Sequence, residues 1–389
     1  MRRTGWPELP TANGGSNVRD VMVLGAGMVP IGRYAPGSAR RLAIDASTAA
    51  LTDAGCTFAD LDAFVCGSAH PLTPRGVYLA KELGLTGLAV LHAEHASASG
   101  LAAMHLAWLG VGSGTYEAVL VLGIDCPETE QPVLEIIEAE GNLPAPPLFA
   151  MWARRRMHER GTQERHLAAV AAKNWNYARA NPYAARRAGE PVTVERVLAS
   201  RVVAPPLTSM MCTPWGSGAG AAVVCSADFA ARHGVGGAVR MSHSHIESET
   251  YAPGHVFQGA IVGPPSMSQR AATAVYEATG RGPDAVDVVQ VHDAFAIEEL
   301  FYYELLGFAG EGEAEALLDK GAFGPGSRER LGLPEFSTHG GLIAGGHPGG
   351  PSGLAQVHET LRQLRGGRSV GLCHMLGAGS VAVTQLYES

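Results

Sequence analysis

The chain is poor in charged residues and holds no long apolar run. Only 17% of its 389 residues are charged, and the formal net charge is −8. Without an excess of basic residues there is no overall field that would favour nucleic acid as the main partner. No apolar stretch reaches the roughly 18 residues that a membrane helix needs, and no apolar run follows the two arginines at the start. These absences predict a cytoplasmic protein without a membrane span.

Cysteines are also few and scattered. The chain has six, with no CxxC pair and no zinc-ligand spacing. Most of them lie in apolar runs such as AFVCG and AVVCS, which is typical of buried, reduced thiols. Neither a disulfide framework nor a metal site is expected. The six positions are Cys56, Cys66, Cys126, Cys212, Cys225 and Cys373.

Apolar residues and glycine are abundant instead. Hydrophobic residues make up 46% of the chain and glycines number 50, so a globular fold with many short turns is expected. The length exceeds what one small core needs and suggests two domains or two fused halves. Apolar β-branched runs alternate with helical patterns, one of them from about Arg40 to Asp53 and ending at Gly55. This alternation predicts an α/β protein whose largely parallel sheet is covered on both faces.

The pattern changes between about 127 and 206. Charged helical stretches replace the buried strands, and prolines stand at 144, 146 and 147. We interpret this part as a lid or loop region inserted in the first half. The predicted organisation is a flexible arm at 1–17, an N-terminal half at 18–230 that contains the insertion, and a C-terminal half at 236–389.

A short internal repeat supports two similar halves. Ser99-Gly100-Leu101-Ala102, followed by His105, recurs as Ser352-Gly353-Leu354-Ala355, followed by His358. Each copy is predicted to start a helix after a loop of small residues, and each precedes an apolar strand with a Leu-Gly pair. Two packed halves would then point two helix N-termini into a shared cleft. Such ends offer free N–H groups that suit a developing oxyanion.

Three segments could carry chemistry. GGLIAGGHPGGPSG holds His347 between glycines that allow a ligand close to the backbone, although a surface loop with an incidental histidine is the alternative. VVQVHDAF places His292 and Asp293 at the end of a buried strand, where ligands collect in open sheets, unless the histidine is only a core residue. HAEHASASG offers Ser97 at a strand-to-helix turn, which taken alone favours a helix cap.

A dinucleotide-binding motif is rejected. VMVLGAGMVPIG has the first two glycines, but Pro30 takes the third position, and no acid follows at the expected distance.

Several segments together resemble thiolases of the sterol-carrier-protein-x type. They are VHDAF, GGHPGGPSG, LGAGSVAV, the stretch at 155–184 and the stretch at 197–224. The resemblance runs from about Val21 to Glu388. It implies the thiolase-like αβαβα five-layer fold of two similar βαβαβαββ halves, assembled as a homodimer or tetramer. It also implies an acyl-CoA substrate, with coenzyme A as the substrate carrier and no other cofactor. Arginines at 154–156, 186 and 187 could meet a CoA phosphate, although a solvated helix face is the favoured role.

The resemblance assigns roles residue by residue. His347 matches the histidine that activates the nucleophile, and His292 the residue that helps to hold the thioester oxygen. Gly377 lies in the C-terminal loop that supplies a backbone oxyanion donor. The family's Cys-Ala-Ser-Gly motif reads Ser97-Ala98-Ser99-Gly100 here, so a serine replaces the nucleophilic thiol.

A second family cysteine, which acts as a proton-transfer base, is replaced as well. Met375 stands at its position, and Cys373 is a weak candidate to substitute for it.

Three functions remain open. The first is an acyltransferase that forms or cleaves C–C bonds by Claisen-type chemistry, with Ser97 as nucleophile. The second is a retro-aldolase that cleaves a β-hydroxyacyl-CoA without a covalent intermediate and works with a small OB-fold, zinc-ribbon partner. The third is a non-catalytic, thiolase-like subunit of a complex, because both family cysteines are missing.

Overall fold

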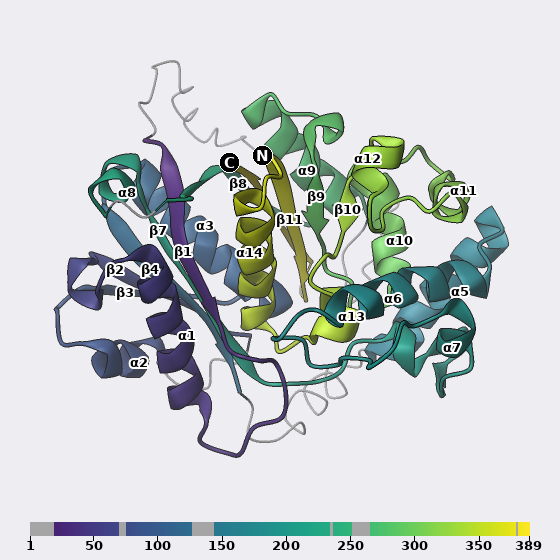
Figure 1. Cartoon of the computed structure of the whole chain (residues 1–389), viewed down its shortest axis with the longest axis horizontal. Coiled ribbons are helices and arrows are strands. Elements are labelled where there is room, and N and C mark those ends of the chain that lie inside the picture. Colours follow the sequence, from purple (N-terminus) through teal and green to yellow (C-terminus); the bar gives the residue numbers. More distant parts are fainter. Residues whose placement is uncertain (1–18, 70–74, 127–143, 234–235, 251–264, 379) are drawn as a thin grey trace, which may run out of the picture.

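The computed structural model describes residues 19–69, 75–126, 144–233, 236–250, 265–378 and 380–389. The predicted arm at 1–17 and the start of the 127–206 insertion lie outside these ranges. Within them, ten strands form one sheet in the order β10-β9-β11-β12-β8-β1-β7-β4-β2-β3 (Figure 1).

The five strands of this sheet that come first in the chain form the N-terminal half. They are β1 (Val21–Met28), β2 (Ala63–Gly67), β3 (Ala89–Ala93), β4 (Ala118–Asp125) and β7 (Gly218–Ser226). Strand β2 pairs in parallel with β3 and β4, whereas β7 is antiparallel to both β4 and β1. Parallel pairs therefore form the outer part of this half and antiparallel pairs its inner part.

The other five strands repeat the arrangement. They are β8 (Val239–Ser248), β9 (Val288–Gln290), β10 (Glu335–Phe336), β11 (Val370–Gly377) and β12 (Val381–Glu388). Strand β9 is parallel to β10 and β11, and β12 is antiparallel to β11 and β8. The two halves join where β1 pairs with β8 through Met22–Arg240 and Val23–Val239. The short sequence repeat is thus part of a duplicated fold.

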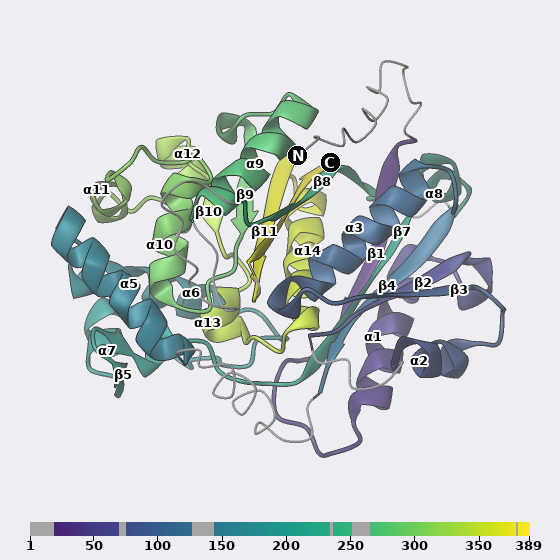
Figure 2. The same ribbon diagram turned by 180° about the vertical axis from the view of Figure 1, so that it is seen from behind.

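Helices cover and separate the two halves, giving αβαβα layers (Figures 1 and 2). The outer helices are α1 (Ala39–Ala54), α2 (Arg75–Leu83) and α8 (Ala227–His233) on the first half, and α9 (Pro265–Thr279) on the second. The central helices, α3 (Ser99–Gly112) and α14 (Gly350–Arg365), pack against each other and against strands of the sheet. Both repeat copies start these central helices, as predicted.

The glycines of the rejected dinucleotide motif have a packing role. Helix α1 buries Leu42, Ala46 and Ala50 against β1 and β7. A Cβ atom on Gly25 or Gly27 would lie 2.4 Å from a backbone nitrogen of α1. These two glycines therefore let the helix approach the strand closely.

The described part of the insertion packs on the second half. It contains α5 (Ala145–Arg160), α6 (Glu164–Ala178), α7 (Val194–Leu198) and the short strands β5 (Val202–Ala204) and β6 (Leu207–Thr208). Helix α6 contacts α10 (Ala296–Leu305), α11 (Ala314–Asp319) and α13 (Gly341–Gly345). The remaining elements are α12 (Ser327–Leu331) and the 3-10 turns η1 (Phe58–Asp60), η2 (Ala96–Ala98), η3 (Ser209–Met211) and η4 (Pro283–Ala285).

One arginine of the insertion departs from the predicted solvated helix face. Arg156 is buried and bonds to Glu304 and Glu315. Its guanidinium ties α5 to the second half because a buried charge needs a partner of opposite sign. No helix within the described ranges has the length and apolar character of a membrane span.

Candidate active site

Ser97 lies in the one-turn helix η2, between β3 and α3. The preceding residue, Ala96, adopts a left-handed conformation with φ of 46°. Ser99 stabilises this turn, because its hydroxyl donates to Ala96 O at 2.6 Å and accepts from His95 N at 2.9 Å. Neither serine caps α3 through its side chain: the Ser99 hydroxyl fixes the turn, and the Ser97 side chain faces the other half of the molecule.

His347 meets the Ser97 side chain. A hydrogen bond of 2.8 Å joins Ser97 Oγ to His347 Nε2, and another of 2.7 Å joins His347 Nδ1 to Ser352 Oγ. When Nδ1 carries its hydrogen and donates to Ser352, the Nε2 lone pair accepts from the Ser97 hydroxyl. This is the arrangement in which a histidine can activate a serine.

The loop around His347 is fixed by a carboxylate from the other half. Asp125, at the end of β4, is buried, and its Oδ2 accepts from Gly350 N at 2.6 Å and from Ala69 N at 2.9 Å. Its Oδ1 accepts from Ser68 Oγ at 2.7 Å. Gly349 has φ of 92°, and a Cβ there would lie 2.7 Å from this carboxylate. Asp125 of the first half thus fixes the position at which α14 of the second half begins.

His292 lies beside His347 and is held by Glu298. The two imidazole centroids are 5.1 Å apart at 81°, and His292 Nδ1 bonds to Glu298 Oε1 at 2.8 Å. Glu298 Oε2 accepts from Phe295 N at 2.9 Å. Burial lowers the pKa of His292 to about 4, and burial also raises the pKa of Glu298 well above its usual value.

The protonation of this pair decides what His292 offers to a ligand. A neutral pair has the Glu298 hydroxyl donating to Nδ1, and an ion pair has both ring nitrogens protonated; Nε2 carries hydrogen in either case. The remaining possibility, a carboxylate beside a neutral imidazole, would leave a net buried charge and is disfavoured. His292 Nε2 is buried and has no hydrogen-bond partner among the described residues. It is therefore an available donor.

Gly377 brings the C-terminal loop against the Ser97 turn. It ends β11, and a Cβ atom at this position would lie 2.1 Å from His95 O. Any other residue would push β11 away from η2. The need for a glycine here is steric.

All four predicted site residues line one cavity of about 510 Å³. Ser97, His292, His347 and Gly377 share it with the aromatic side chains of Phe149, Phe295 and Trp215 and with two arginines, Arg186 and Arg201. The volume is in the range of small-molecule sites. Within the described ranges, no group of three or more His, Cys, Asp or Glu side chains is arranged to hold a metal ion.

Asp293, predicted alongside His292, helps to hold the turn that carries His292. Its carboxylate accepts from Leu342 N at 2.7 Å and from Asn174 Nδ2 at 2.7 Å, and it is fully buried. Burial, with the nearby Glu299, raises its pKa well above the usual value. Asn174 belongs to α6, so the insertion helps to hold the turn that carries His292.

Cysteine chemistry finds no support at this site. Cys373 is buried against Thr360, and burial raises its pKa to about 12. Met375 accepts from Gln356 Nε2, and neither sulfur lines the cavity. Among the described residues, Cys212 is the only thiol in the cavity wall, and it donates to Thr208 O with a pKa raised by burial to about 12. Cys373 therefore lies outside the candidate site and does not take the place of the missing cysteine.

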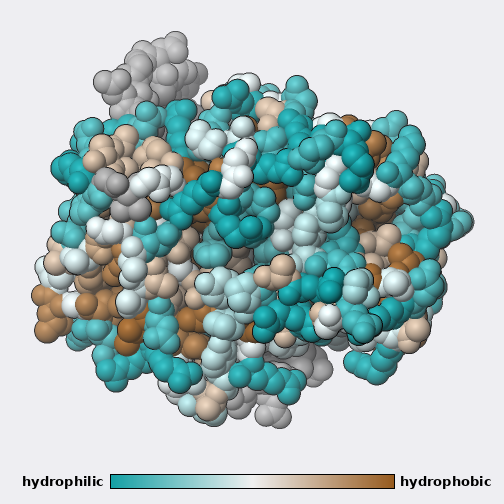
Figure 3. All heavy atoms as spheres, viewed as in Figure 1, coloured by the Kyte–Doolittle hydropathy of each residue, from teal (hydrophilic) through white to brown (hydrophobic). Residues whose placement is uncertain are grey.

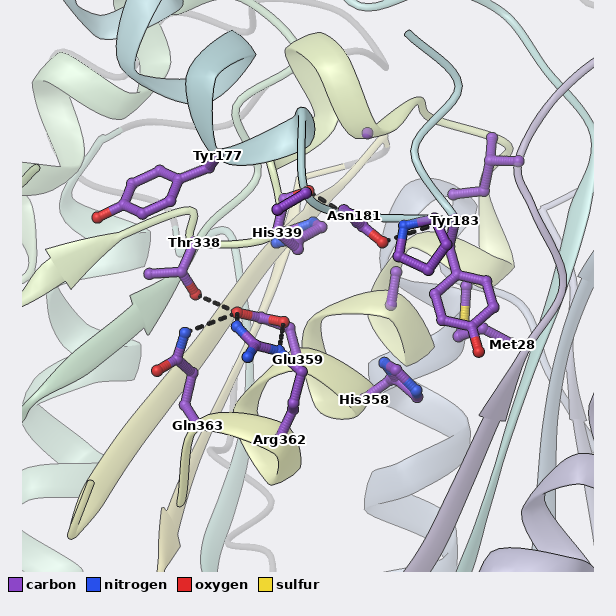
Figure 4. A pocket seen from close by; sticks show the side chains of 15 residues that line it. Met28, Tyr177, Asn181, Tyr183, Thr338, His339, His358, Glu359, Arg362 and Gln363 are labelled. Atoms are coloured by element: carbon purple, nitrogen blue, oxygen red, sulfur yellow. Dashed lines mark hydrogen bonds and ion pairs between the residues drawn. The ribbon is translucent and has the colours of Figure 1, made fainter. Parts of the chain in front are cut away.

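A second cavity, also of about 510 Å³, lies along another face of α14 (Figure 4). The Glu359 carboxylate there accepts from Thr338, Arg362 and Gln363, so its polar groups largely satisfy one another. The repeat histidine His358 lines this space, and the other repeat histidine, His105, bonds to Ser244. Neither histidine of the repeat lies in the cavity that contains Ser97.

Sequence reasoning missed the residues that support the site. The sequence did not predict the roles of Glu298 and Asp125, nor that Ser352 would bond to His347 Nδ1. Glu298 had one usable signal, an acid in the first helical turn after the VHDAF segment. Asp125 had no signal, because the groups it binds lie 56 and 225 residues away in the chain.

Comparisons with known proteins identify the family of the chain. Residues 261–376 match the family model described as "Thiolase C-terminal domain-like". The acetyl-CoA acetyltransferase of Methanothermobacter thermautotrophicus is 32% identical, over 95% of this chain and 100% of the relative. Sterol carrier protein 2 of Rattus norvegicus is 31% identical, over 95% and 72%. Benzoylsuccinyl-CoA thiolase subunit BbsB of Thauera aromatica is 35% identical, over 75% and 74%.

Solved structures share the fold. The Ltp2-ChsH2(DUF35) aldolase superposes with a TM-score of 0.81 at 23% identity, covering 95% of this chain and 98% of the other. An acetyl-CoA acetyltransferase from Syntrophomonas wolfei gives 0.73 at 18% identity, covering 95% and 99%.

Proposed function

The chain belongs to the thiolase superfamily, and we propose that it transfers acyl groups from coenzyme A thioesters with Ser97 as the nucleophile. The observation that carries this proposal is the 2.8 Å hydrogen bond between Ser97 Oγ and His347 Nε2 at the wall of a cavity. A serine hydroxyl depends wholly on a base to become nucleophilic, and here the base is in place.

In the first step, His347 takes the Ser97 proton while Oγ attacks the thioester carbonyl carbon. The C–S bond then breaks, CoA leaves as a thiolate, and the imidazolium returns the proton to the sulfur. The products are an ester on Ser97 and free CoA. Ser352, at 2.7 Å from Nδ1, would hold the ring in the tautomer that this step needs.

The negative charge that develops on the carbonyl oxygen needs donors. His292 Nε2–H and the Gly377 backbone N–H are proposed to supply them, together with the positive end of α3. Removal of one such donor typically costs about 100- to 1000-fold in kcat.

The second step would be of Claisen type. His347, neutral again once CoA has left, would take a proton from the α-carbon of a second acyl-CoA. The resulting carbanion attacks the ester carbon, a C–C bond forms, the C–O bond to Ser97 breaks, and the imidazolium returns the proton to Ser97 Oγ. The reverse sequence cleaves the same C–C bond. Coenzyme A acts only as substrate carrier, and the proposal needs no other cofactor.

Mass spectrometry tests the covalent step. The protein is mixed with a panel of acyl-CoAs, free CoA is measured, and the mass of the peptide that contains Ser97 is recorded. An acyl adduct on Ser97 that vanishes in Ser97→Ala is expected, and Ser97→Cys should restore it. Turnover that persists in Ser97→Ala without any adduct would rule out the proposal.

A retro-aldolase is the second candidate, favoured by the TM-score of 0.81 to an aldolase complex. In that case the cavity would stabilise the enolate released from a β-hydroxyacyl-CoA, and a small OB-fold, zinc-ribbon protein would be the partner. Its distinguishing result is cleavage of β-hydroxyacyl-CoA, with the partner present, that survives Ser97→Ala.

A non-catalytic subunit is the third candidate, and one relative is itself described as a thiolase subunit. Under this hypothesis the complex would keep its function after His292→Ala combined with His347→Ala. Loss of activity in that double variant would exclude it.

A further inference from the structure

Arg186 lies in the wall of the cavity that contains Ser97, on the loop that follows α6. Its backbone N donates to Ala344 O at 2.9 Å, just before the turn that carries His347. Its Nη1 donates to Ser209 O at 3.1 Å and to Cys212 O at 3.0 Å. The guanidinium carbon lies 5.7 Å from the centre of the Trp175 ring. Backbone and side chain are thus both fixed beside the catalytic turn.

The charge of this side chain has no counter-charge among the residues that the structure describes. No carboxylate within the described ranges forms an ion pair with Arg186, in contrast to Arg156, which bonds to two buried glutamates. Glu298 is the only carboxylic acid among the described lining residues, and it is engaged by His292 and Phe295 N. Arg201, exposed, adds a second positive charge to the same wall.

The two carbonyl oxygens that accept from Arg186 carry no full charge, so a half-buried guanidinium without a carboxylate is costly unless a ligand supplies the anion. Burial lowers the pKa of Arg186, which reflects this loss of water around the charge. The guanidinium stays protonated because its ordinary pKa is so high. Its Nε and Nη2 donors bond to no other described residue, so a planar, bidentate anion can bind there.

We propose that Arg186 binds a carboxylate on the acyl group of the substrate, which makes the preferred substrate an acyl-CoA with a second, free acid. The proposal rests on the acyl-CoA function given above. The apolar wall of Phe149, Phe295 and Trp215 would contact the carbon chain between the thioester and this acid. Arg186 would then be a specificity-determining residue.

The phosphates of CoA are the other possible anion. They lie at the far end of the pantetheine arm from the thioester carbon. Arg186, in contrast, is bonded to a residue three positions before His347. The acyl side of the thioester is therefore the favoured source of the anion.

Calorimetry with unreactive ligands tests the inference independently of catalysis. The ligands are thioether analogues of CoA, in a series of chain lengths, that end in a carboxylate or in the isosteric carboxamide. They lack the thioester carbonyl, so binding does not require acyl transfer. The same pairs built on pantetheine lack the diphosphate and remove any contribution from it. The proteins are the wild type, Arg186→Met, Arg186→Lys and, as matched control, Arg187→Met on the neighbouring exposed residue.

The wild type and Arg187→Met should bind the carboxylate about 10- to 100-fold more tightly than the carboxamide at one chain length, on both carriers. Arg186→Met should lose this preference, and Arg186→Lys should keep part of it. Equal binding of acid and amide by the wild type would overturn the inference, even if Arg186→Met does not fold. If Arg186→Met weakens the binding of acid and amide equally, and only in the CoA series, Arg186 binds a phosphate instead. An acid preference without any acyl transfer would leave the inference standing and remove the proposed reaction.

Discussion

At the scale of single residues, the site depends on where hydrogens lie. Ser97 and His347 make the direct contact, and Ser352 and Glu298 each bond to the Nδ1 atom of one imidazole, so the hydrogens they share affect what each Nε2 can donate or accept. Both supporting side chains are buried, so water cannot replace them easily. We expect both residues to act through the histidines.

Glu298 gives a test of this interpretation. Glu298→Gln should keep activity within a few-fold, because an amide N–H can donate to His292 Nδ1 while the amide oxygen still accepts from Phe295 N. Glu298→Leu should lower kcat/KM about 10- to 100-fold, since the tautomer is no longer fixed. Steady-state kinetics of both variants, with thermal unfolding as a folding control, distinguish the two outcomes. Equal losses in Glu298→Gln and Glu298→Leu would mean that a charged carboxylate is required.

At the scale of elements, one carboxylate joins the two halves and another anchors a helix within the second half. Asp125 at the end of β4 binds the first N–H groups of α14, and Asp293 after β9 binds the first N–H groups of α13. A helix N-terminus favours a carboxylate because its N–H groups lack partners within the helix. The loop with His347 lies between these two anchored starts, which keeps its imidazole in reach of Ser97.

Asp125→Ala should therefore affect both stability and catalysis. We expect the free energy of unfolding to fall by about 1–3 kcal/mol, because buried N–H groups lose their acceptor. We also expect kcat to fall, because the His347 loop is released. Asp125→Asn, which keeps one acceptor oxygen, should lie between Asp125→Ala and the wild type. Urea unfolding and kinetics on the same samples measure this, and full activity in Asp125→Ala would contradict it.

Strand β3 bears on how copies of the chain associate. It ends the sheet, and Val77, Tyr78, Leu85 and Leu91 are exposed on or near it. Hydrophobic side chains gather over this edge, at the lower left of Figure 3. An exposed apolar edge strand is a ready pairing surface. The homodimer or tetramer that the resemblance implies is expected to associate along this edge.

Leu91→Lys should then convert the assembly to monomers, since a charge on an edge strand opposes pairing. Size-exclusion chromatography with light scattering gives the mass directly. Leu331→Lys, on the exposed helix α12, is the control and should leave the mass unchanged. A monomeric wild type, or an unchanged mass in Leu91→Lys, would exclude this interface.

At the scale of the whole molecule, several histidines are buried within the second half. His374 bonds to Thr384 at 2.8 Å and Ser268 at 3.0 Å, and burial lowers its pKa to about 3. In the unfolded chain a histidine has a pKa of about 6.5. Below that value the unfolded state binds a proton that the folded state refuses, so His374 makes the fold less stable as pH falls towards 3.

The contribution of His374 can be measured as a difference in the free energy of unfolding between two pH values. Between pH 7 and pH 5, His374 should lower the free energy of unfolding by about 2 kcal/mol. His374→Gln should remove that part of the pH dependence, whereas other titrating groups affect both proteins alike. Urea unfolding of the two proteins at both pH values tests this. Parallel pH dependences would show that His374 titrates normally in the folded state.

Much of this molecule follows from local sequence. The spacing of Leu42, Ala46 and Ala50 predicts α1, and Gly55 ends it with φ of 64°. The repeated Ser-Gly-Leu-Ala predicts the duplicated halves, and resemblance selects Ser97, His292, His347 and Gly377. These features could be predicted because hydrophobic period, turn chemistry and motif are properties of short segments.

The tertiary structure decided what distant segments do to one another. Ser97 and His347 are 250 residues apart in the chain, and only the packing of α3 against α14 brings them within 2.8 Å. The same packing placed His105 and His358 away from the site, buried Cys373 out of reach, and left Arg186 without a carboxylate partner among the described residues. Contacts between remote segments depend on how whole halves pack, and no local pattern encodes that packing.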